Sequence, residues 1–154
     1  MEQEKSPFEI VNLKEDTGFL MWQVSKLWEL THERVLKRYY NLSHIQYAVL
    51  ASIHWLTLHS KKEISQVLLA QHTKIDPMTI SQLLKVLEAK GYILRQTHST
   101  DVRAKSICLT QQGKDLMNEA VFTVTKLNVN FFKILGKNLP RFNQLMIDIL
   151  NAND

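Results

Sequence analysis

Hydrophobic residues recur every three or four positions along most of the chain, the spacing that places side chains on one face of an α-helix. The clearest case is the segment 76–91. Asp76 and Pro77 suit the first turn of a helix, and Gly91 suits the residue that follows its last turn. The apolar stripe contains Ile80, Leu83, Leu84 and Leu87, and the outer face contains Met78, Ser81, Gln82 and Lys85. We therefore predict an amphipathic helix with a mostly polar outer face.

A second short helix is predicted directly before this one. Ser60 and Glu63 have the spacing of a capping box, which predicts that the helix begins there. Its helically spaced positions are Ile64, Val67, Leu68 and Gln71. The segment 73–75 then connects the two helices. Such a pair is typical of a helix-turn-helix motif, although many structural corners have the same arrangement.

Two runs of β-prone residues follow, at 92–94 and 106–109. The polar loop 96–104 lies between them and carries Asp101 and Arg103. Short β-prone runs on either side of a polar loop predict an antiparallel hairpin. We therefore expect a mainly α protein with a small β-hairpin wing, that is, a winged helix-turn-helix.

The chain outside this region is also helical in pattern. A long helix is predicted over 16–40, and Ser43 with Gln46 forms a capping box for a helix that reaches about residue 58. After the wing, apolar residues at helical spacing predict a helix from about 116 to 131. The last helix is predicted to open at Pro140 and to carry Phe142, Leu145, Met146 and Ile149. These helices are apolar on more than one side, so they either form a dimer interface or fold back on a monomer core.

Several short motifs lie in one register between Leu69 and Gly113. They are Leu69-Ala70, Asp76-Pro77-x-Thr79, Leu87-Glu88-x-x-Gly91, Arg95, Asp101-x-Arg103-Ala104 and Leu109-Thr110-x-x-Gly113. Together they resemble the multiple antibiotic resistance regulator (MarR) family of winged-helix transcription factors. The resemblance implies a DNA-binding region over 43–110 and helical dimerisation regions at 1–42 and 111–154. It also implies a homodimeric repressor that binds a pseudo-palindromic operator in double-stranded DNA.

The resemblance assigns DNA contacts to the helix 76–91 and to the wing. Arg103 would enter the minor groove, where the phosphates concentrate negative potential, and Asp101 would hold it through a charge-assisted bond. The alternative is that these two residues form an ordinary surface pair. The full set of expected DNA-binding residues is Thr79, Ser81, Gln82, Lys85, Arg95, Asp101, Arg103 and Lys105.

The chain departs from the family pattern at some of these positions. Gln82 and Val86 stand where relatives often have Arg, and Lys74 stands where the turn commonly has Gly. A Gln side chain bonds adenine through N6 and N7, whereas Arg favours guanine. The sequence therefore predicts an operator that is A·T-rich where Gln82 contacts it.

Charge and composition agree with this assignment. The chain has 154 residues, which suits one domain, and a formal net charge of +4. Residues 60–115 contain nine Lys or Arg against five Asp or Glu, so the excess positive charge lies where phosphates would be contacted. The charged N-terminal segment is unlike a signal peptide, and no apolar run has the length of a membrane span. We therefore expect a cytoplasmic protein with no membrane partner.

Histidines and the single cysteine raise the question of a metal or redox sensor. Four histidines, at positions 44, 54, 59 and 72, are close in sequence, but none of them forms the i, i+4 pair of a helical zinc motif. Cys108 is expected to fill space on the second wing strand. Neither a nucleophile elbow nor a phosphate-binding glycine loop occurs, so we expect no catalytic residue, no metal and no cofactor. A metal or redox sensor and a protein-interaction module without an operator remain the alternative functions.

An effector site is the last expectation. Members of the family often bind small aromatic anions between the dimerisation helices and the winged domain. The residues that could form such a site here are Trp22, Lys26, His54, Trp55 and His59. They supply aromatic faces and cationic or donor groups, but the same side chains could simply pack a helix junction.

Overall fold

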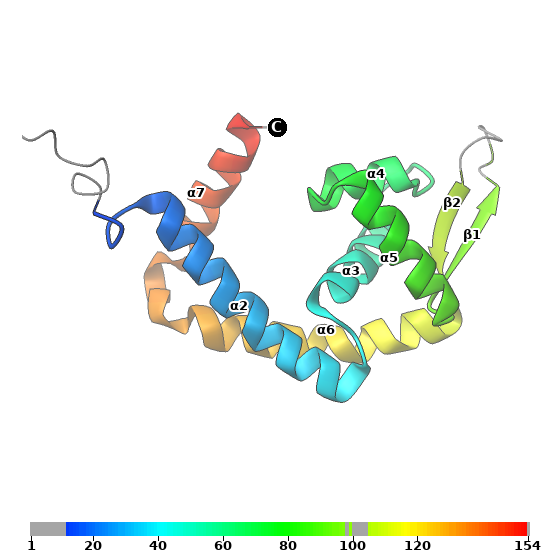
Figure 1. The fold of residues 1–154 in the computed structure, drawn as a ribbon, viewed down its shortest axis with the longest axis horizontal. Coiled ribbons are helices and arrows are strands. Elements are labelled where there is room, and N and C mark those ends of the chain that lie inside the picture. Colours follow the sequence, from blue (N-terminus) through cyan, green and yellow to red (C-terminus); the bar gives the residue numbers. More distant parts are fainter. Residues whose placement is uncertain (1–11, 98, 100–104, 154) are drawn as a thin grey trace, which may run out of the picture. The chain divides into compact units, whose positions relative to one another are not determined.

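The computed structural model describes residues 12–97, 99 and 105–153. The described elements follow one another along the chain as shown in Figure 1. They are α2 (Thr17–Tyr40), α3 (His44–His59), α4 (Gln66–Thr73), α5 (Pro77–Ala89), β1 (Ile93–Thr97), β2 (Lys105–Leu109), α6 (Gln111–Phe132), the 3₁₀ helix η1 (Lys133–Asn138) and α7 (Leu139–Ala152). The predicted fold class, mainly α with a two-stranded wing, is confirmed. The chain divides into two compact units, one ending at Tyr47 and the other beginning at Ala48.

The first unit consists mainly of α2, whose predicted extent is confirmed. Asp16 caps its start by accepting a bond of 2.7 Å from the Phe19 backbone N–H. The predicted capping box of the next helix is also present, because Ser43 and Gln46 each accept a bond of 3.2 Å from the other's backbone N–H. Within α2 only His32 and Leu36 are buried. The remaining apolar residues of α2 are therefore at least partly exposed.

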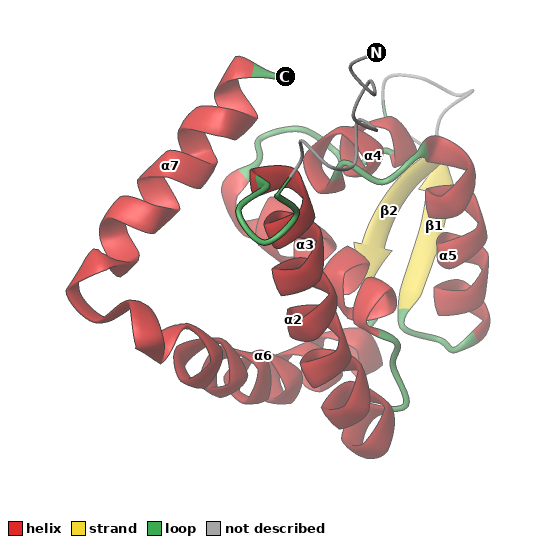
Figure 2. Cartoon of the chain, turned by 60° about the vertical axis from the view of Figure 1, so that its left-hand side comes forward, coloured by secondary structure: helices red, strands yellow, loops and turns green. Residues whose placement is uncertain are grey.

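The second unit has its core between α3, α4, α5, the hairpin and α6. Its buried side chains include Leu50, Ile53, Leu69, Ile80, Leu84, Leu87, Ile93, Ile107 and Met117. The strands β1 and β2 are antiparallel, with Ile93 paired to Leu109 and Arg95 to Ile107. Figure 2 shows this hairpin, in yellow, beside α5. Ile93, Ile107 and Leu109 are buried, so one face of the hairpin packs on the core, as expected for a half-buried antiparallel pair.

The predicted start of the first helix of the pair was wrong. α4 begins at Gln66, and its N-cap is Ser65, which accepts a bond of 3.2 Å from the Leu68 backbone N–H. Glu63 makes no capping box with Ser60; its carboxylate accepts a bond of 3.1 Å from the Ser99 backbone N–H. The Ile64 carbonyl accepts a bond of 2.8 Å from the Ile107 N–H. The chain before α4 therefore runs beside β2.

The end of α5 and the start of α6 are joined by a close contact. Gly91 has a φ of +76°, the left-handed conformation that ends many helices. The hydroxyl of Thr110 donates to the Gly91 carbonyl at 2.6 Å and accepts from the Gly113 N–H at 3.0 Å. Thr110 is thus the N-cap of α6, so α6 begins several residues earlier than its apolar pattern predicted.

The C-terminal part changes direction between two helices. η1 contains Gly136, whose φ of +48° and ψ of −126° are not helical. α7 follows with Pro140 in its first turn, as predicted. No residue of α7 is buried. Among the helices of the described residues, none is both long enough and apolar enough to cross a membrane.

Candidate nucleic-acid interface

The candidate DNA-binding surface lies on α5, whose two faces differ sharply. Ile80, Leu84 and Leu87 are completely buried and fix the orientation of the helix. The opposite face exposes Met78, Gln82, Lys85, Val86 and Ala89. Thr79 and Ser81, which the sequence also assigned to DNA, are half-buried. The outward face predicted from the sequence is therefore present, with Gln82 and Lys85 its most accessible polar side chains.

The start of α5 is held by local hydrogen bonds. The carboxylate of Asp76 accepts from the Thr79 N–H at 2.9 Å and from the Thr79 hydroxyl at 2.5 Å. These two bonds hold the pKa of the Asp76 carboxyl below its ordinary value. The side-chain amide of Gln66 donates to the Pro77 carbonyl at 3.1 Å and so ties α4 to this turn. The hydroxyl proton of Thr79 is used inside the cap, which leaves Thr79 with its acceptor lone pairs.

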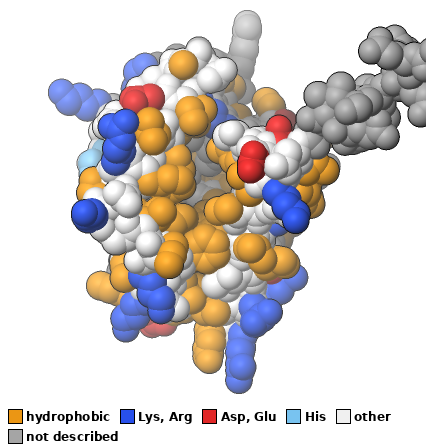
Figure 3. All heavy atoms as spheres, turned by 90° about the vertical axis from the view of Figure 1, so that its left-hand side faces the viewer, with side chains coloured by type: hydrophobic (Ala, Val, Ile, Leu, Met, Phe, Trp, Pro, Cys, Tyr) orange, Lys and Arg blue, Asp and Glu red, His pale blue; other side chains and the backbone are white. Residues whose placement is uncertain are grey.

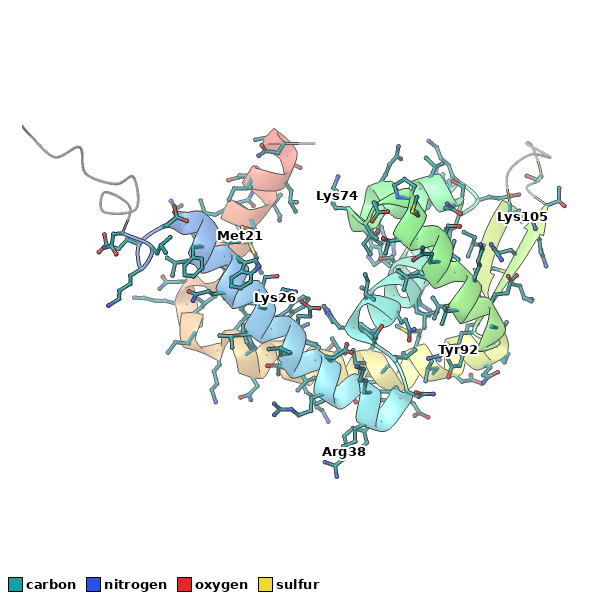
Figure 4. All side chains as sticks on the ribbon, in the orientation of Figure 1. Met21, Lys26, Arg38, Lys74, Tyr92 and Lys105 are labelled. Carbon is teal, nitrogen blue, oxygen red and sulfur yellow. The ribbon has the colours of Figure 1, made fainter. Side chains whose placement is uncertain are left out.

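Lys74 lies in the turn between the two helices and has a φ of +58°. A side chain at positive φ is strained, which explains why glycine suits this turn. Figure 4 shows Lys74 at the start of α5, Tyr92 at its other end and Lys105 on β2. Lys105 is exposed at the outer end of the hairpin. Lys74 and Lys105 thus lie on different sides of α5, at positions suited to phosphate contacts if α5 enters a DNA groove.

The wing is attached to α5 by an ion pair. The Nε of Arg95 donates to Glu88 Oε2 at 2.9 Å, and its Nη2 contacts the same oxygen. This hydrogen bond, together with the positive charge of the guanidinium, holds the pKa of the Glu88 carboxyl below its ordinary value. The structure places Arg95, expected from the sequence to bind DNA, against the helix instead of leaving its guanidinium free. Its assignment to a DNA contact stays a prediction, and so do those of Asp101 and Arg103, which lie outside the described residues.

The pair of Glu88 and Arg95 gives a test that depends on pH. The folded pKa of Glu88 is depressed, so the stability that the pair contributes is present above the unfolded pKa and is lost as pH falls through the folded pKa. We expect a double-mutant cycle of Glu88→Gln and Arg95→Gln, measured by urea unfolding, to give a coupling of about 0.2–1 kcal/mol at pH 7. The coupling should decrease as the pH is lowered through the folded pKa of Glu88. A coupling that does not change with pH would mean that the charge of Glu88 does not matter.

A second candidate site lies on α3, α4 and α6 within the second unit. A pocket of about 340 Å³ is lined by Ala51, Ser52, His54, Trp55, Leu58, His72, Met117 and Val121. The ring of Trp55 stacks with those of His59 and His72, with centroid distances of 4.4 and 5.3 Å. The structure thus brings together the three predicted effector residues that follow Ala48, and it adds His72, which the sequence analysis did not include. Trp22 and Lys26 belong to the other unit, where Lys26 pairs with Glu29 at 2.7 Å.

Metal and redox sites have less support. Within residues 12–97, 99 and 105–153, no three His, Cys, Asp or Glu side chains are grouped so that they could hold a metal ion. Cys108 is half-buried on β2, and its Sγ lies 3.9 Å from the Leu94 carbonyl oxygen of the neighbouring strand. This placement agrees with the role of a small strand residue.

The family model and the relative that match this chain are a winged-helix domain and an HTH-type transcriptional regulator. Residues 38–127 match the family model described as ArnR1-like, winged-helix domain. The chain is 30% identical over 115 residues to YdcH, an HTH-type transcriptional regulator of Bacillus subtilis strain 168, and this match covers 75% of the chain and 77% of YdcH. Among solved structures, it is similar to a mutant of Escherichia coli MarR complexed with operator DNA, at 22% identity and a TM-score of 0.78, with 95% of this chain and 99% of that chain covered. It is also similar to CouR of Rhodococcus jostii RHA1 bound to p-coumaroyl-CoA, at 25% identity and a TM-score of 0.73, with 92% and 93% covered.

Proposed function

Since this chain belongs to the MarR family of DNA-binding, winged-helix transcriptional regulators, which are not enzymes, we propose that it is a cytoplasmic homodimeric repressor of a pseudo-palindromic operator. In this proposal residues 43–110 bind DNA, and residues 1–42 and 111–154 form the dimer. Arg103 of the wing contacts the minor groove, and Asp101 holds Arg103 through a charge-assisted bond. A symmetric dimer would place two copies of α5 about 34–36 Å apart, one helical turn of DNA.

The observation that carries the proposal is the outer face of α5. A helix that enters the major groove needs side chains that are exposed and able to bond to base edges near its N-terminal end. Gln82 meets both conditions, and the buried residues of the opposite face hold its helix in one orientation. The same surface carries no exposed carboxylate between Met78 and Lys85 that would repel phosphates.

The proposed dimer is supported by apolar side chains that a single chain leaves in water. On α7 these are Leu145, Ile147, Ile149 and Leu150, each about half exposed, and on α6 they include Phe122 and Val129. Figure 3 shows many hydrophobic side chains at the surface on one face. Exposed apolar residues this numerous on terminal helices suit burial against a second copy of the chain.

The proposal is tested by selecting bound sequences from random duplex DNA and then substituting Gln82. We expect an enriched pseudo-palindrome. Gln82→Ala should weaken binding to it by about 1–3 kcal/mol and change binding to unrelated duplex little, because a bidentate contact to adenine is lost. Lys85→Ala should instead weaken both duplexes and flatten their dependence on salt. Equal losses of affinity on both duplexes for Gln82→Ala would mean that Gln82 does not recognise the base sequence.

We further propose that the pocket beside Trp55 binds a small aromatic anion that releases the operator. Its volume of about 340 Å³ is in the range of ligand pockets, and its lining combines Trp55 and apolar side chains with two histidines. Leu58, Met117 and Val121 would pack against the aromatic part of the ligand, and an imidazole N–H of a lining histidine would donate to its carboxylate. The anion can weaken DNA binding only to the extent that it prefers the form of the dimer that does not bind DNA.

Tryptophan fluorescence titration tests this effector. A panel of aromatic acids should include one that quenches fluorescence saturably. Saturating operator should weaken the binding of this acid, and the acid should weaken operator binding by the same factor. A tenfold effect corresponds to about 1.4 kcal/mol of coupling. Trp55→Ala should reduce the response and leave ligand-free DNA binding intact. Quenching that is indifferent to operator would contradict the switch.

A further inference from the structure

The first turn of α5 exposes a large apolar side chain beside the polar residue that is expected to bind bases. Met78 is 73% exposed, compared with 42% for Val86 on the same helix. It precedes Gln82 by four residues, so the two side chains are neighbours on one face of the helix. Single exposed apolar residues are common on protein surfaces, so the position of Met78 carries the argument, not its exposure alone.

The surroundings of Met78 leave its turn with little hydrogen-bonding capacity toward a base. Pro77 has no N–H. The backbone N–H and hydroxyl of Thr79 both donate to Asp76. The side-chain amide of Gln66 donates to the Pro77 carbonyl. The first turn is therefore fixed in place, and it exposes the long apolar side chain of Met78.

In the major groove the base edges carry only one apolar group, the 5-methyl of thymine. We propose that Met78 is a specificity-determining residue that packs on a thymine methyl next to the base pair contacted by Gln82. Four residues of helix rise about 6 Å, and adjacent base pairs are about 3.4 Å apart, so the thymine lies one or two steps from that base pair. This inference rests on the proposed operator binding and adds a base preference to it.

Uracil substitution tests the contact directly, because uracil pairs as thymine does but lacks the methyl group. The probe is the duplex obtained by selection, with one thymine at a time replaced by deoxyuridine in each half-site. We expect one position within two steps of the Gln82 contact to weaken wild-type binding about fourfold per half-site, the effect of about one buried methyl group. Met78→Ala should bind the thymine and uracil duplexes equally, whereas Met78→Leu should keep most of the difference.

Val67→Ala is the matched control. Val67 is 64% exposed on α4, the helix that in such motifs crosses the DNA backbone, so this variant should keep the fourfold preference for thymine. Melting temperatures of all variants check that folding is intact. The inference is overturned if no thymine is sensitive to uracil or if Met78→Ala keeps the full preference, while selection still yields an operator. If selection yields no enriched sequence, operator binding itself fails and the inference fails with it.

Discussion

Gly113→Ala should destabilise the protein by about 3 kcal/mol or more, although replacing a helical glycine by alanine ordinarily stabilises by up to about 1 kcal/mol. A Cβ at this position would lie 2.1 Å from the Tyr92 carbonyl oxygen and 3.0 Å from its carbonyl carbon. Both are backbone atoms, so no side chain can move aside. Tyr92 is further fixed because its carbonyl accepts a bond of 3.0 Å from the Thr110 N–H. We expect the midpoint of thermal unfolding to fall by about 6–12 °C.

Gly18→Ala is the control for Gly113→Ala. Gly18 is also a helical glycine, but the nearest atom to an added Cβ is Asp16 Oδ1, at the ordinary contact distance of 3.5 Å. This variant should be neutral or stabilise by about 0.4–1 kcal/mol, because it restricts the unfolded chain and favours the helix. If both variants had equal unfolding midpoints, the close contact between α6 and the turn at Tyr92 would be wrong.

The predictions that rested on local hydrogen bonds were the most successful. Asp76 and Gly91 bracket α5 because a cap and a left-handed residue act within one turn of the chain. The capping box of Ser43 and Gln46 was predicted for the same reason and is present. The hairpin followed from two β-prone runs, and only its lengths differ, since β1 continues to Thr97.

The start of α4 shows what such local patterns omit. Ser60 and Glu63 have the spacing of a capping box, but Glu63 bonds to Ser99, far away in sequence, and Ile64 bonds to β2. Pairing with a distant strand competes with helix formation, and a short sequence motif carries no information about that pairing. Ser65 satisfies the same capping requirement five residues after Ser60.

Side-chain partners within the candidate site were equally hard to predict. The sequence motifs predicted that Arg95 contacts DNA. In the structure Glu88 lies near the C-terminal end of α5, and its carboxylate reaches the Arg95 guanidinium because β1 folds against α5. His72 joined the stack on Trp55 only because α4 packs near α3, which no spacing along the sequence reveals. Exposure of Gln82, by contrast, followed from the helical period alone.

Introducing charge on α7 should abolish dimerisation and weaken operator binding at least about 100-fold. Leu145 and Ile149 are one helical turn apart and are 48% and 53% exposed in the single chain. The double variant Leu145→Glu with Ile149→Glu therefore costs the isolated chain little. In a dimer the remaining exposed half of each side chain would be buried, which contributes about half of the roughly 1.5–3 kcal/mol of full burial, and each buried carboxylate would add a desolvation penalty. A monomer loses the gain of about 10²–10⁴ that comes from binding two linked half-sites.

Sedimentation and operator titration measure the two effects together. The charge-matched control is Asn143→Glu with Asn151→Glu, which adds the same two carboxylates to exposed polar positions of α7. The control should remain a dimer and lose little affinity, because its carboxylates stay in water. A binding curve for a duplex with a single half-site separates assembly from recognition, since the α7 double variant should bind it as well as the wild type does. If the double variant sediments as a dimer with unchanged operator affinity, the apolar face of α7 does not form the interface, and the exposed apolar side chains of α2 and α6 become the surfaces to substitute next.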